Sequence, residues 1–545
     1  MQKKISPILI VITLIIVVII VGAITFITNR YKPSTKMADS SQYFGAVATD
    51  ETTIIINGEI AEDKGKVIEG KVYLSEQLVG QYINSRFYWD MHENQMLYTT
   101  PYEIIEINDL KQFDDTYYIA LDFIKEYTDM LSESFEEPQR TAIFTQEAAF
   151  TEGLVIADGA VRVRGGVKSD ILRKVAKHED TVFVLEELDN WIKVLTIDGY
   201  TGYIEKEKIE LLGTFEIAKT TTDNEYTSIL RDHKINLAWH QTMSQSSNEA
   251  LLDVIKDVTG VNVISPTWFS IVDEDGTISS LASAEYVQQA HEQGLEVWGL
   301  IDNFNPDVKT LDVLSHRDKR ANIIEQLIDI AKEVGLDGIN IDLESITVET
   351  GPHYVQFLRE ISIRCRAENL VLSVDIPPPF PYNKHYNIKE QGVVVDYVII
   401  MGYDEHYSGG EAAGSVASLG FVRSGIEETL KDVPKEKVIN GIPFYTRVWR
   451  EPFGSSNITS EVLGMNGADN YIAEHQMKTH WDAYVGQTVA ELETEDALYR
   501  IWVEDERSIE EKMKLIKEHD LAGVAQWKLG FERSSVWDII DRYLK

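Results

Sequence analysis

The sequence predicts an α/β protein whose C-terminal part, residues 232–545, forms a (β/α)8 barrel of the TIM type. Two observations support this prediction: apolar strand-like segments alternate with helical patterns across the range, and there are eight such segments. The predicted strands are Ile235–Trp239, Val261–Ser265, Leu295–Ile301, Gly338–Leu343, Leu370–Asp375, Tyr397–Met401, Val438–Pro443 and Gly523–Trp527. A doubly wound sheet is the alternative, although no Gly-rich phosphate-binding loop follows the first strand.

Helical patterns lie between these strands. The clearest are Ala321–Val334 and Ser508–His519, in which apolar residues recur at helical spacing. The second begins with Ser508 and has Glu511 three residues later, which is the pattern of a capping box. We therefore expect this helix to begin at Ser508.

Length and composition limit the possible classes of protein. The 545 residues are enough for three or four domains of ~150 residues each. The net charge is 51 − 89 = −38, so a nucleic acid is excluded as a partner because most of the surface would repel its phosphates. Cys365 is the only cysteine, which excludes an intrachain disulfide and a Cys-based zinc site.

The segment before these domains is apolar. Residues 5–28 carry no charge, and ~20 apolar residues are enough to span a membrane as a helix. Secretory signals have apolar regions of only ~7–15 residues, so an uncleaved anchor is favoured over a signal peptide. We expect a transmembrane helix over 5–28, with residues 1–4 as a cytoplasmic tip. Basic residues flank both ends of the segment, so they do not decide its orientation.

Two smaller modules are predicted between the anchor and the barrel. Residues 29–50 are polar and lack periodicity, as in a linker, and residues 51–150 contain short alternating runs typical of a small α/β or β-rich module. Within that module, Val72-Tyr73-Leu74 and Phe87-Tyr88-Trp89-Asp90 resemble the N-terminal-type module of copper amine oxidases. The resemblance implies a spacer and no copper, because the segment has no cluster of His ligands.

Residues 151–213 have β-branched runs that are interrupted every 8–12 residues, as in a small β-barrel. The runs Val161–Arg164, Trp191–Val194 and Asp198–Ile204 follow one another in an order that resembles a bacterial Src-homology-3-like (SH3-like) domain. Such modules are common in cell-wall proteins, so the resemblance implies wall binding. A purely structural role for the aromatic residues in the barrel core is the alternative.

Polar residues concentrate at the end of the fourth predicted strand. Side chains alternate along a strand, so Asn340, Asp342 and Glu344 share one face and the three intervening aliphatic residues share the other. In a barrel the polar row must point to the lumen, and Glu344 then lies at the catalytic mouth. Buried carboxylates are costly unless they are paired or hydrogen-bonded, so this row predicts a functional site.

These residues resemble the active-site motif D-G-x-D-x-D-x-E of glycoside hydrolase family 18, with Asn340 in place of the second Asp. Met401-Gly402-Tyr403-Asp404 is similar to the M-x-Y-D motif of that family, and Trp527 to its sugar-stacking Trp. Further similarities point to the branch found in Gram-positive bacteria and their spores, where Asn also occurs at the position of Asn340. They lie in 265–269, 441–447 and 499–505.

The resemblance implies hydrolysis next to an N-acetylhexosamine whose own acetamido oxygen acts as the nucleophile, an exception to the two-carboxylate scheme. Glu344 would be the general acid and then the base. Asp342 would hold the acetamido N–H, and Asn340 would hydrogen-bond Asp342 and fix its orientation. Tyr403, Asp404 and the neighbouring Met401 would contribute to the sugar subsite.

The roles of several other residues are more open. Trp527 is expected to pack under a distorted sugar ring, and Trp268 and Tyr445 could line the groove or belong to the core. Arg447 could contact the substrate or form a salt bridge with a carboxylate at the mouth. Trp502, Glu504 and Asp505 lie in a predicted irregular insertion after the seventh strand, and their role is left open. His240 is expected to be a hydrogen-bonded histidine. No metal constellation and no cofactor are predicted.

Two functions are therefore compared. The first is a glycosidase that cuts β-1,4 bonds next to N-acetylglucosamine, above all in peptidoglycan, with chitin-like glycan as the other substrate. The second is a lectin-like barrel that binds such polysaccharides without turnover. Intact Glu344, Asp342 and Tyr403 favour the enzyme. Because this substrate is extracellular, we expect a single-pass protein of the cell membrane with its barrel on the cell-wall side.

Overall fold

The computed structural model describes residues 7–146, 149–219, 221 and 225–545. The chain forms two compact units. The first comprises the residues up to Trp89 together with Ile107–Asp223, and the second comprises Asp90–Glu106 together with Asn224–Lys545. Each unit is described by itself.

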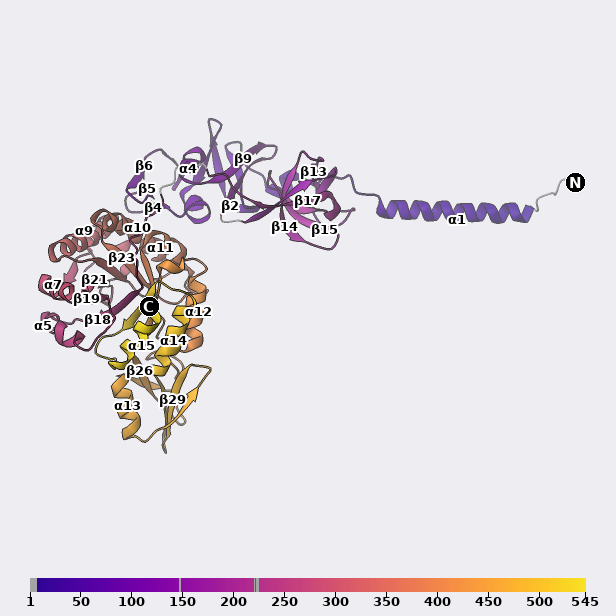
Figure 1. Ribbon diagram of the computed structural model, residues 1–545. Helices are drawn as coiled ribbons and strands as arrows, with labels where there is room; N and C mark the ends of the chain where they lie inside the picture. The colour runs from indigo at the N-terminus through magenta and orange to yellow at the C-terminus, as the bar shows by residue number, and fades with distance from the viewer. Residues whose placement is uncertain (1–6, 147–148, 220, 222–224) are drawn as a thin grey trace. The chain divides into compact units, whose positions relative to one another are not determined.

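The second unit contains a closed barrel of eight parallel strands, as the sequence predicts (Figure 1). The barrel closes because the first strand pairs with both the second and the last. The strands are β18 (Ile235–His240), β19 (Val263–Ile271), β21 (Glu296–Asp302), β22 (Gly338–Asp342), β23 (Val371–Ile376), β24 (Tyr397–Ile400), β25 (Val438–Pro443) and β31 (Gly523–Trp527). A short strand, β20 (Ile278–Ser280), pairs antiparallel with β19.

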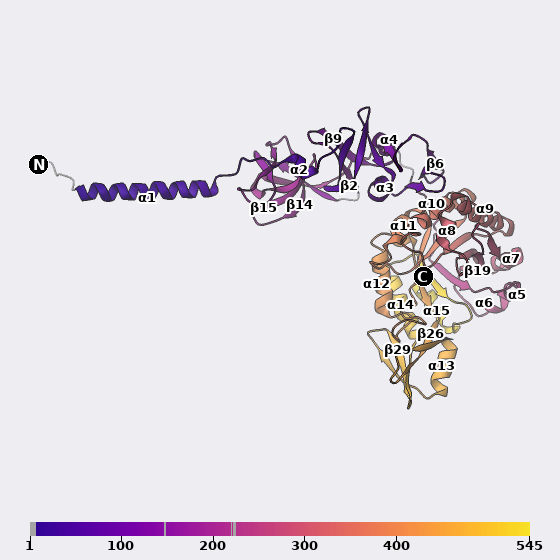
Figure 2. The same ribbon diagram turned by 180° about the vertical axis from the view of Figure 1, so that it is seen from behind.

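Apolar side chains fill both sides of the barrel wall. On β22, Ile339 and Ile341 are fully buried on the outer side, in one cluster with residues of the surrounding helices. These helices include α7 (Ala284–Glu292), α9 (Arg317–Val334), α10 (Gly351–Glu368), α12 (Leu419–Thr429), α14 (Glu506–Glu518) and α15 (Ser535–Leu544), which surround the strands in Figure 2. A second cluster fills the lumen and includes Leu237, Trp239, Leu300 and Ile399. The lumen is therefore a packed core with its polar row near one end.

The segment after β25 is an ordered subdomain, so the prediction of an irregular insertion was wrong. It forms an antiparallel five-stranded sheet with one helix, α13 (Met465–Glu474). The strands are β26 (Tyr445–Pro452), β27 (Thr459–Gly464), β28 (Lys478–Asp482), β29 (Gln487–Glu493) and β30 (Ala497–Val503). Val448, Ala468 and Ile501 form part of a separate small core.

A hairpin from the N-terminal half of the sequence belongs to the barrel unit. It contains β5 (Gln95–Thr99) and β6 (Ile104–Ile107) and begins at the end of β4 (Phe87–Asp90). The guanidinium of Arg320 on α9 lies 3.8 Å from a carboxylate oxygen of Asp90, and both side chains are fully buried. Gln356 on α10 also donates a hydrogen bond to Thr99 Oγ1 over 2.9 Å. Buried polar contacts thus attach this hairpin to the barrel helices.

The first unit holds two seven-stranded sheets. The first sheet is mixed, since β1 (Glu51–Ile56) pairs in parallel with β10 (Gln139–Thr145). Its other strands are β2 (Glu59–Ile68), β3 (Lys71–Ser75), β7 (Leu110–Phe113), β8 (Thr116–Ala120) and β9 (Met130–Glu136), with helices α3 (Glu76–Leu78), η1 (Val79–Ile83) and α4 (Leu121–Tyr127). This agrees with the predicted β-rich module.

The second sheet forms the SH3-like domain. Its strands are β11 (Phe150–Val155), β12 (Gly159–Arg162), β13 (Ile171–Val175), β14 (Thr181–Glu187), β15 (Trp191–Thr196), β16 (Thr201–Glu205) and β17 (Ile209–Phe215). The segment expected as a linker contains a short helix, α2 (Ser40–Phe44). Phe44 is buried in the core of the SH3-like sheet, because its ring packs against Tyr200 at 4.6 Å between centroids.

Helix α1 (Pro7–Tyr31) covers most of the segment that the sequence predicts to span a membrane. Within the described part of the chain, no helix is both long enough and apolar enough to cross a membrane. This finding contradicts the predicted transmembrane helix and the predicted single-pass location in the cell membrane.

Candidate active site

The polar row predicted on the fourth barrel strand lies inside the lumen. Asn340 is fully buried and Asp342 is 6% exposed, while Glu344, two residues beyond Asp342, is half-buried. The alternation that buries Ile339 and Ile341 against the outer helices places these polar residues on the inner face. Glu344 is therefore the member of the row that solvent and a substrate can reach.

Asn340 organises the floor of the site. Its side-chain oxygen accepts hydrogen bonds from Trp239 Nε1 at 3.0 Å and from Ser265 Oγ at 3.2 Å. Its amide nitrogen donates to Ser373 Oγ at 3.1 Å and to Asp375 Oδ1 at 2.8 Å. We expected Asn340 to hydrogen-bond Asp342, and this expectation was wrong. Both side chains project inward from one strand, so the Asn340 amide nitrogen instead reaches the neighbouring strand β23, and its oxygen contacts side chains of β18 and β19.

The backbone of Glu344 is held by Asn303, which follows β21. Asn303 Nδ2 donates to the carbonyl of Glu344, and the amide of Glu344 donates to Asn303 Oδ1, both over 2.9 Å. Ser345, the next residue, has a φ of 54°, in the left-handed region. This two-point contact fixes where the Glu344 side chain begins, although that side chain lies beyond the end of the strand.

The carboxyl groups of the site strongly influence one another. Burial raises the pKa of Asp342 well above its usual value, and the charges of Asp375, Glu344 and Asp302 raise it further. Burial also raises the pKa of Glu344, with added contributions from Asp404 and Asp302. Glu344 therefore stays protonated to a higher pH than an exposed glutamate, as a general acid requires.

The motif after the sixth strand supplies hydroxyl and carboxyl groups. Tyr445 donates a hydrogen bond of 2.6 Å from its hydroxyl to Asp404 Oδ1. The rings of Tyr403 and Tyr445 lie 6.4 Å apart, and Tyr403 also contacts Trp239 edge-on at 6.4 Å. Burial is the main reason that the pKa of the Tyr403 hydroxyl lies well above its usual value, so this group stays a hydrogen-bond donor.

Trp527 and Trp239 form an aromatic pair at the bottom of the site. Trp527 ends β31 and is half-buried, while Trp239 is 1% exposed, and their rings lie 5.9 Å apart at an interplanar angle of 61°. The exposed side of Trp527 can contact a sugar ring. Trp239 supports it from beneath and also donates to Asn340.

Three other residues that the sequence predicts for the site, Trp268, Arg447 and Met401, have different surroundings. Trp268 is 2% exposed and packs against Tyr286, so it belongs to the outer core and does not line the groove. Side chains alternate between the two faces of a strand, and Trp268 is an odd number of positions, three, from the inward-facing Ser265. Its side chain therefore points outward. Arg447 donates to Ser460 at 3.2 Å, and no carboxylate of the described residues lies within ion-pair distance of it. Met401 is half-buried directly after β24.

His240 is hydrogen-bonded, as predicted. It is 5% exposed, and its Nδ1 lies 2.9 Å from the hydroxyl of Tyr286. Burial lowers its pKa to about 4, so the ring is neutral at pH 7. Among the described residues, no group of three or more His, Cys, Asp or Glu side chains is placed to hold a metal ion.

Three residues of the site were not predicted from the sequence: Trp239, Asp302 and Asp375. Asp302 ends β21, where it accepts a hydrogen bond of 2.7 Å from Ser270 Oγ. Asp375 is 2% exposed near the end of β23. A signal was present, because Ser373 and Asp375 alternate with aliphatic residues on their strand as Asn340 and Asp342 do on theirs.

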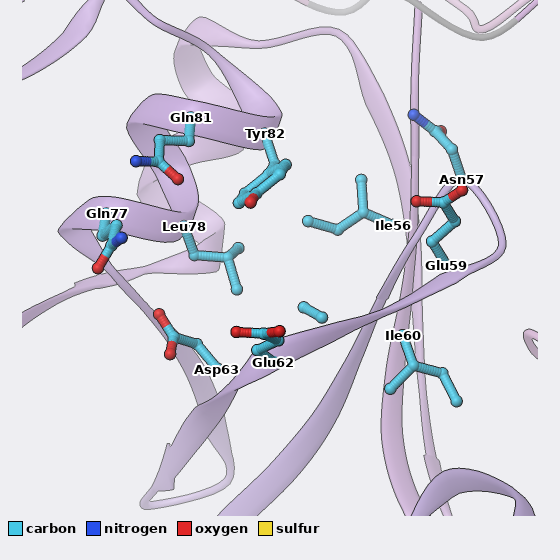
Figure 3. A pocket seen from close by; sticks show the side chains of 11 residues that line it. Ile56, Asn57, Glu59, Ile60, Glu62, Asp63, Gln77, Leu78, Gln81 and Tyr82 are labelled. Carbon is cyan, nitrogen blue, oxygen red and sulfur yellow. The ribbon is translucent and has the colours of Figure 1, made fainter.

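A separate pocket lies in the first unit (Figure 3). It has a volume of about 460 Å³ and lies between β2 and the helical segment α3–η1. Its walls include Glu59, Glu62 and Asp63 on one side and Gln81 and Tyr82 on the other. Those three acidic side chains are exposed to solvent, so the pocket lacks the buried reactive groups that the barrel site has.

Two parts of the chain match known families. Residues 237–532 match the family described as glycosyl hydrolases family 18, which is more than half of the chain. Residues 157–210 match the family described as bacterial SH3 domain.

Curated relatives match the barrel region. The chain is 28% identical over 300 residues to the uncharacterised glycosylase YvbX of Bacillus subtilis, a match that covers 53% of this chain and 86% of that protein. It is 24% identical over 279 residues to the cortical fragment-lytic enzyme of Bacillus anthracis, covering 49% of this chain and 64% of that enzyme. The chain thus spans less than two thirds of the second relative.

Solved structures share the barrel fold. The spore cortex-lytic enzyme SleL of Bacillus cereus superposes with a TM-score of 0.52 at 22% identity, covering 57% of this chain and 74% of that one. A chitinase from Chromobacterium violaceum superposes with a TM-score of 0.51 at 20% identity, covering 57% of this chain and 99% of that one. At these identities the likeness concerns the fold alone.

Proposed function

This chain belongs to family 18 of the glycosyl hydrolases and is a glycoside hydrolase, and we propose that it cuts β-1,4 bonds next to N-acetylglucosamine in peptidoglycan. The observation that carries the proposal is the polar row at the end of β22. Glu344 lies at its outer end, half-buried, with a pKa raised by burial and by neighbouring carboxylates.

In the proposed mechanism Glu344 donates its proton to the oxygen of the bond being cut, while the acetamido carbonyl oxygen of the substrate attacks the anomeric carbon. The product of this step is a cyclic oxazolinium ion. Glu344, now ionised, removes a proton from the water that opens the ring, so configuration at the anomeric carbon is retained. The enzyme therefore needs only one carboxyl group that directly exchanges protons with the reacting oxygens.

The remaining side chains stabilise the cation and hold the sugar. Asp342 binds the acetamido N–H and supplies negative charge beside the oxazolinium ion in a site of low polarity. Tyr403 donates a hydrogen bond from its hydroxyl to the acetamido group, and Asp404, oriented by the Tyr445 hydroxyl, binds the sugar. Trp527 contacts the apolar face of the ring, with Met401 beside this subsite.

Two lines of support favour peptidoglycan over chitin. The cortical fragment-lytic enzyme of Bacillus anthracis, a curated relative, is named for its action on the spore cortex. The chain also carries a bacterial SH3 domain, which we propose to bind the cell wall. A lectin-like barrel without turnover is not favoured, since Glu344 and Asp342 are both in place.

The test is digestion of purified peptidoglycan, with identification of the new reducing ends. Glu344→Gln keeps the size of the side chain but cannot donate the proton, so turnover should fall ~10²–10⁴-fold while binding of the polymer persists. Glu349→Gln is the matched control, because Glu349 is an exposed carboxylate on the same loop. The proposal fails if Glu344→Gln turns over as fast as the control on every N-acetylglucosamine polymer.

A further inference from the structure

Three aspartates form a row across neighbouring strands of the barrel. Asp302 on β21 is the register partner of Asp342 on β22. The register that pairs Ile341 with Val374 brings Asp342 beside Asp375 on β23 at the next position. All three carboxyl groups therefore lie at one level of the lumen, one position below Glu344 on the same face.

Within the described part of the chain, no cation compensates the charge of this row. The described titratable groups that interact electrostatically with Asp342 or Asp375 come from the elements packed around them, and none of these groups is basic. They are Asp302 from β21, Glu344 beyond β22, Tyr354 from α10, Tyr386 from η3 (Lys384–Tyr386) and Tyr403 beyond β24. Adjacent buried carboxylates without a cation cannot all be ionised. At least one proton must stay in the row at neutral pH.

The hydrogen bonds indicate where that proton resides. Asp302 accepts from Ser270 Oγ and from the amide of Phe304, and Asp375 accepts from the amide of Asn340. Asp342 Oδ1 is buried and has no hydrogen-bond partner among the described residues. Acceptor bonds favour the ionised form of a carboxyl group, so Asp342 is less suited to carry the charge than Asp375.

We propose that Asp375 is a positioning residue for this reaction, which shares one proton with Asp342 and accepts it when Asp342 binds the acetamido group. In that transfer the O–H bond of Asp342 breaks and an O–H bond of Asp375 forms, and the pair carries one negative charge before and after. Asp342 becomes the anion at the moment when the oxazolinium ion needs one. Asn340 makes the arrangement possible, since its amide donates to Asp375 where a carboxylate would repel it. This inference rests on the proposed function.

The first test is the pH profile of Asp375→Asn. Asp375 is a like charge beside Asp342, so its removal should move the acidic limb of kcat/KM down by about one pH unit. The basic limb, which reports Glu344, should move less than the acidic limb, because burial is the main cause of the raised pKa of Glu344. We expect kcat to fall about 10- to 100-fold with KM changed less than about threefold, because Asp342 then lacks the partner that positions it.

Ser373→Ala is the matched control. Ser373 lies on the same strand and face and also contacts Asn340, but it carries no charge. Both limbs should keep their positions in this variant. An acidic limb that moves equally in Ser373→Ala and Asp375→Asn would show packing to be the cause and would overturn the proposal.

A compensating double variant separates charge from position. Asn340→Asp combined with Asp375→Asn moves the carboxyl group from β23 to β22 and keeps the number of charges constant. It should recover at least about tenfold of the activity that Asp375→Asn loses. Two results together would contradict the proton sharing: a double variant that is no more active than Asp375→Asn, and an acidic limb in Asp375→Asn that has not moved from its wild-type position.

Infrared difference spectroscopy tests the shared proton without any turnover. At pH 7 the wild type should show, in addition to the carbonyl stretching band of protonated Glu344, the band of one further buried protonated carboxyl group; Asp375→Asn should lack this further band, and Ser373→Ala should keep it. If the wild type hydrolyses no N-acetylglucosamine polymer, the proposed function fails and this band still decides the present inference. Its persistence in Asp375→Asn would overturn the inference even if the enzyme is active.

Discussion

At the scale of single residues, Asp342 shows that a site can be built at the expense of stability. Its carboxyl group is buried, one oxygen lacks a hydrogen bond, and three other carboxyl groups lie near it. Burial and like charges raise its pKa, so the folded protein binds a proton more readily than the unfolded chain does. The ionised group therefore destabilises the fold above its folded-state pKa, and this cost disappears as the pH falls toward ~4.

Asp342→Asn should consequently stabilise the protein while abolishing most of its activity. We expect Tm at pH 7.5 to rise by about 2–4 °C or more, and the gain to shrink toward pH 4. Calorimetry at a series of pH values measures this. Asp253→Asn, at an exposed position, is the control and should leave Tm unchanged at every pH. A variant that is destabilised at pH 7.5 would show that Asp342 has a favourable partner after all.

Residue-level prediction succeeded where strand parity alone decides the outcome. The inward positions of Asn340, Asp342 and Glu344 follow from alternation along one strand. The partner of Asn340 could not be predicted in this way, because hydrogen bonds across a parallel barrel depend on the register between strands. The same limit applies to Asp375, which is remote in sequence from the motif and becomes part of the site only through the pairing of β22 with β23.

At the scale of elements, the junction between the inserted sheet and helix α14 is a buried polar network. Lys512 donates to Glu504 over 2.9 and 3.0 Å, and both side chains are 1% exposed. Gln487 on β29 donates to the same carboxylate at 2.6 Å and accepts from Ser415, in the loop that carries Asp404. The network therefore connects the insertion to the loop of the active site.

Removing one member of the buried pair should be more harmful than removing both. Lys512→Met leaves the Glu504 carboxylate buried without its cation, which should lower the free energy of unfolding by about 3–5 kcal/mol. The double variant Glu504→Leu with Lys512→Met should recover part of this loss. Urea unfolding of both variants measures the difference. A double variant less stable than Lys512→Met would contradict the prediction, because removal of the unpaired Glu504 charge would then bring no gain in stability.

The elements themselves were predicted unevenly. The eight barrel strands were found because both of their faces are buried, which produces long apolar runs that propensity and pattern both favour. The start of α14 was missed by two residues: Asp505 is the N-cap, and Ser508, expected to begin the helix, is its third residue in a reciprocal capping box. The inserted sheet was missed because some of its strands lack the long buried apolar runs of the barrel strands. The burial of β28, for example, is low throughout.

At the scale of the whole molecule, acid should destabilise the barrel unit through its buried histidines. Burial lowers the pKa of His240 and of His353 to about 4. The unfolded chain then takes up protons at ~6.5 that the folded protein does not, so stability falls as the pH drops from ~6.5 to about 4. Buried carboxyl groups such as Asp342 change the stability in the opposite direction as the pH falls. The contribution of one histidine is therefore measured as the difference in stability change between the wild type and a variant that lacks it.

His240→Gln measures that difference. For a His with these two pKa values, linkage gives a loss of about 2 kcal/mol between pH 7.5 and pH 5. Glutamine does not titrate in this range, so the variant should lose about 2 kcal/mol less than the wild type over the same interval. Urea unfolding at both pH values is the measurement. Equal losses in the two proteins would mean that His240 is protonated in the folded state.

The hairpin of Asp90–Glu106 also has a consequence for the order in which the molecule is made. Ribosomes add about 5–20 residues per second, and Arg320 follows Glu106 by 320 − 106 = 214 residues. The hairpin is therefore synthesised about 10–40 s before the helix that buries Asp90, and its polar groups stay in water during that time. The hairpin can pack against α9 only after Arg320 has been synthesised. The second unit therefore completes its fold after most of the first unit has left the ribosome.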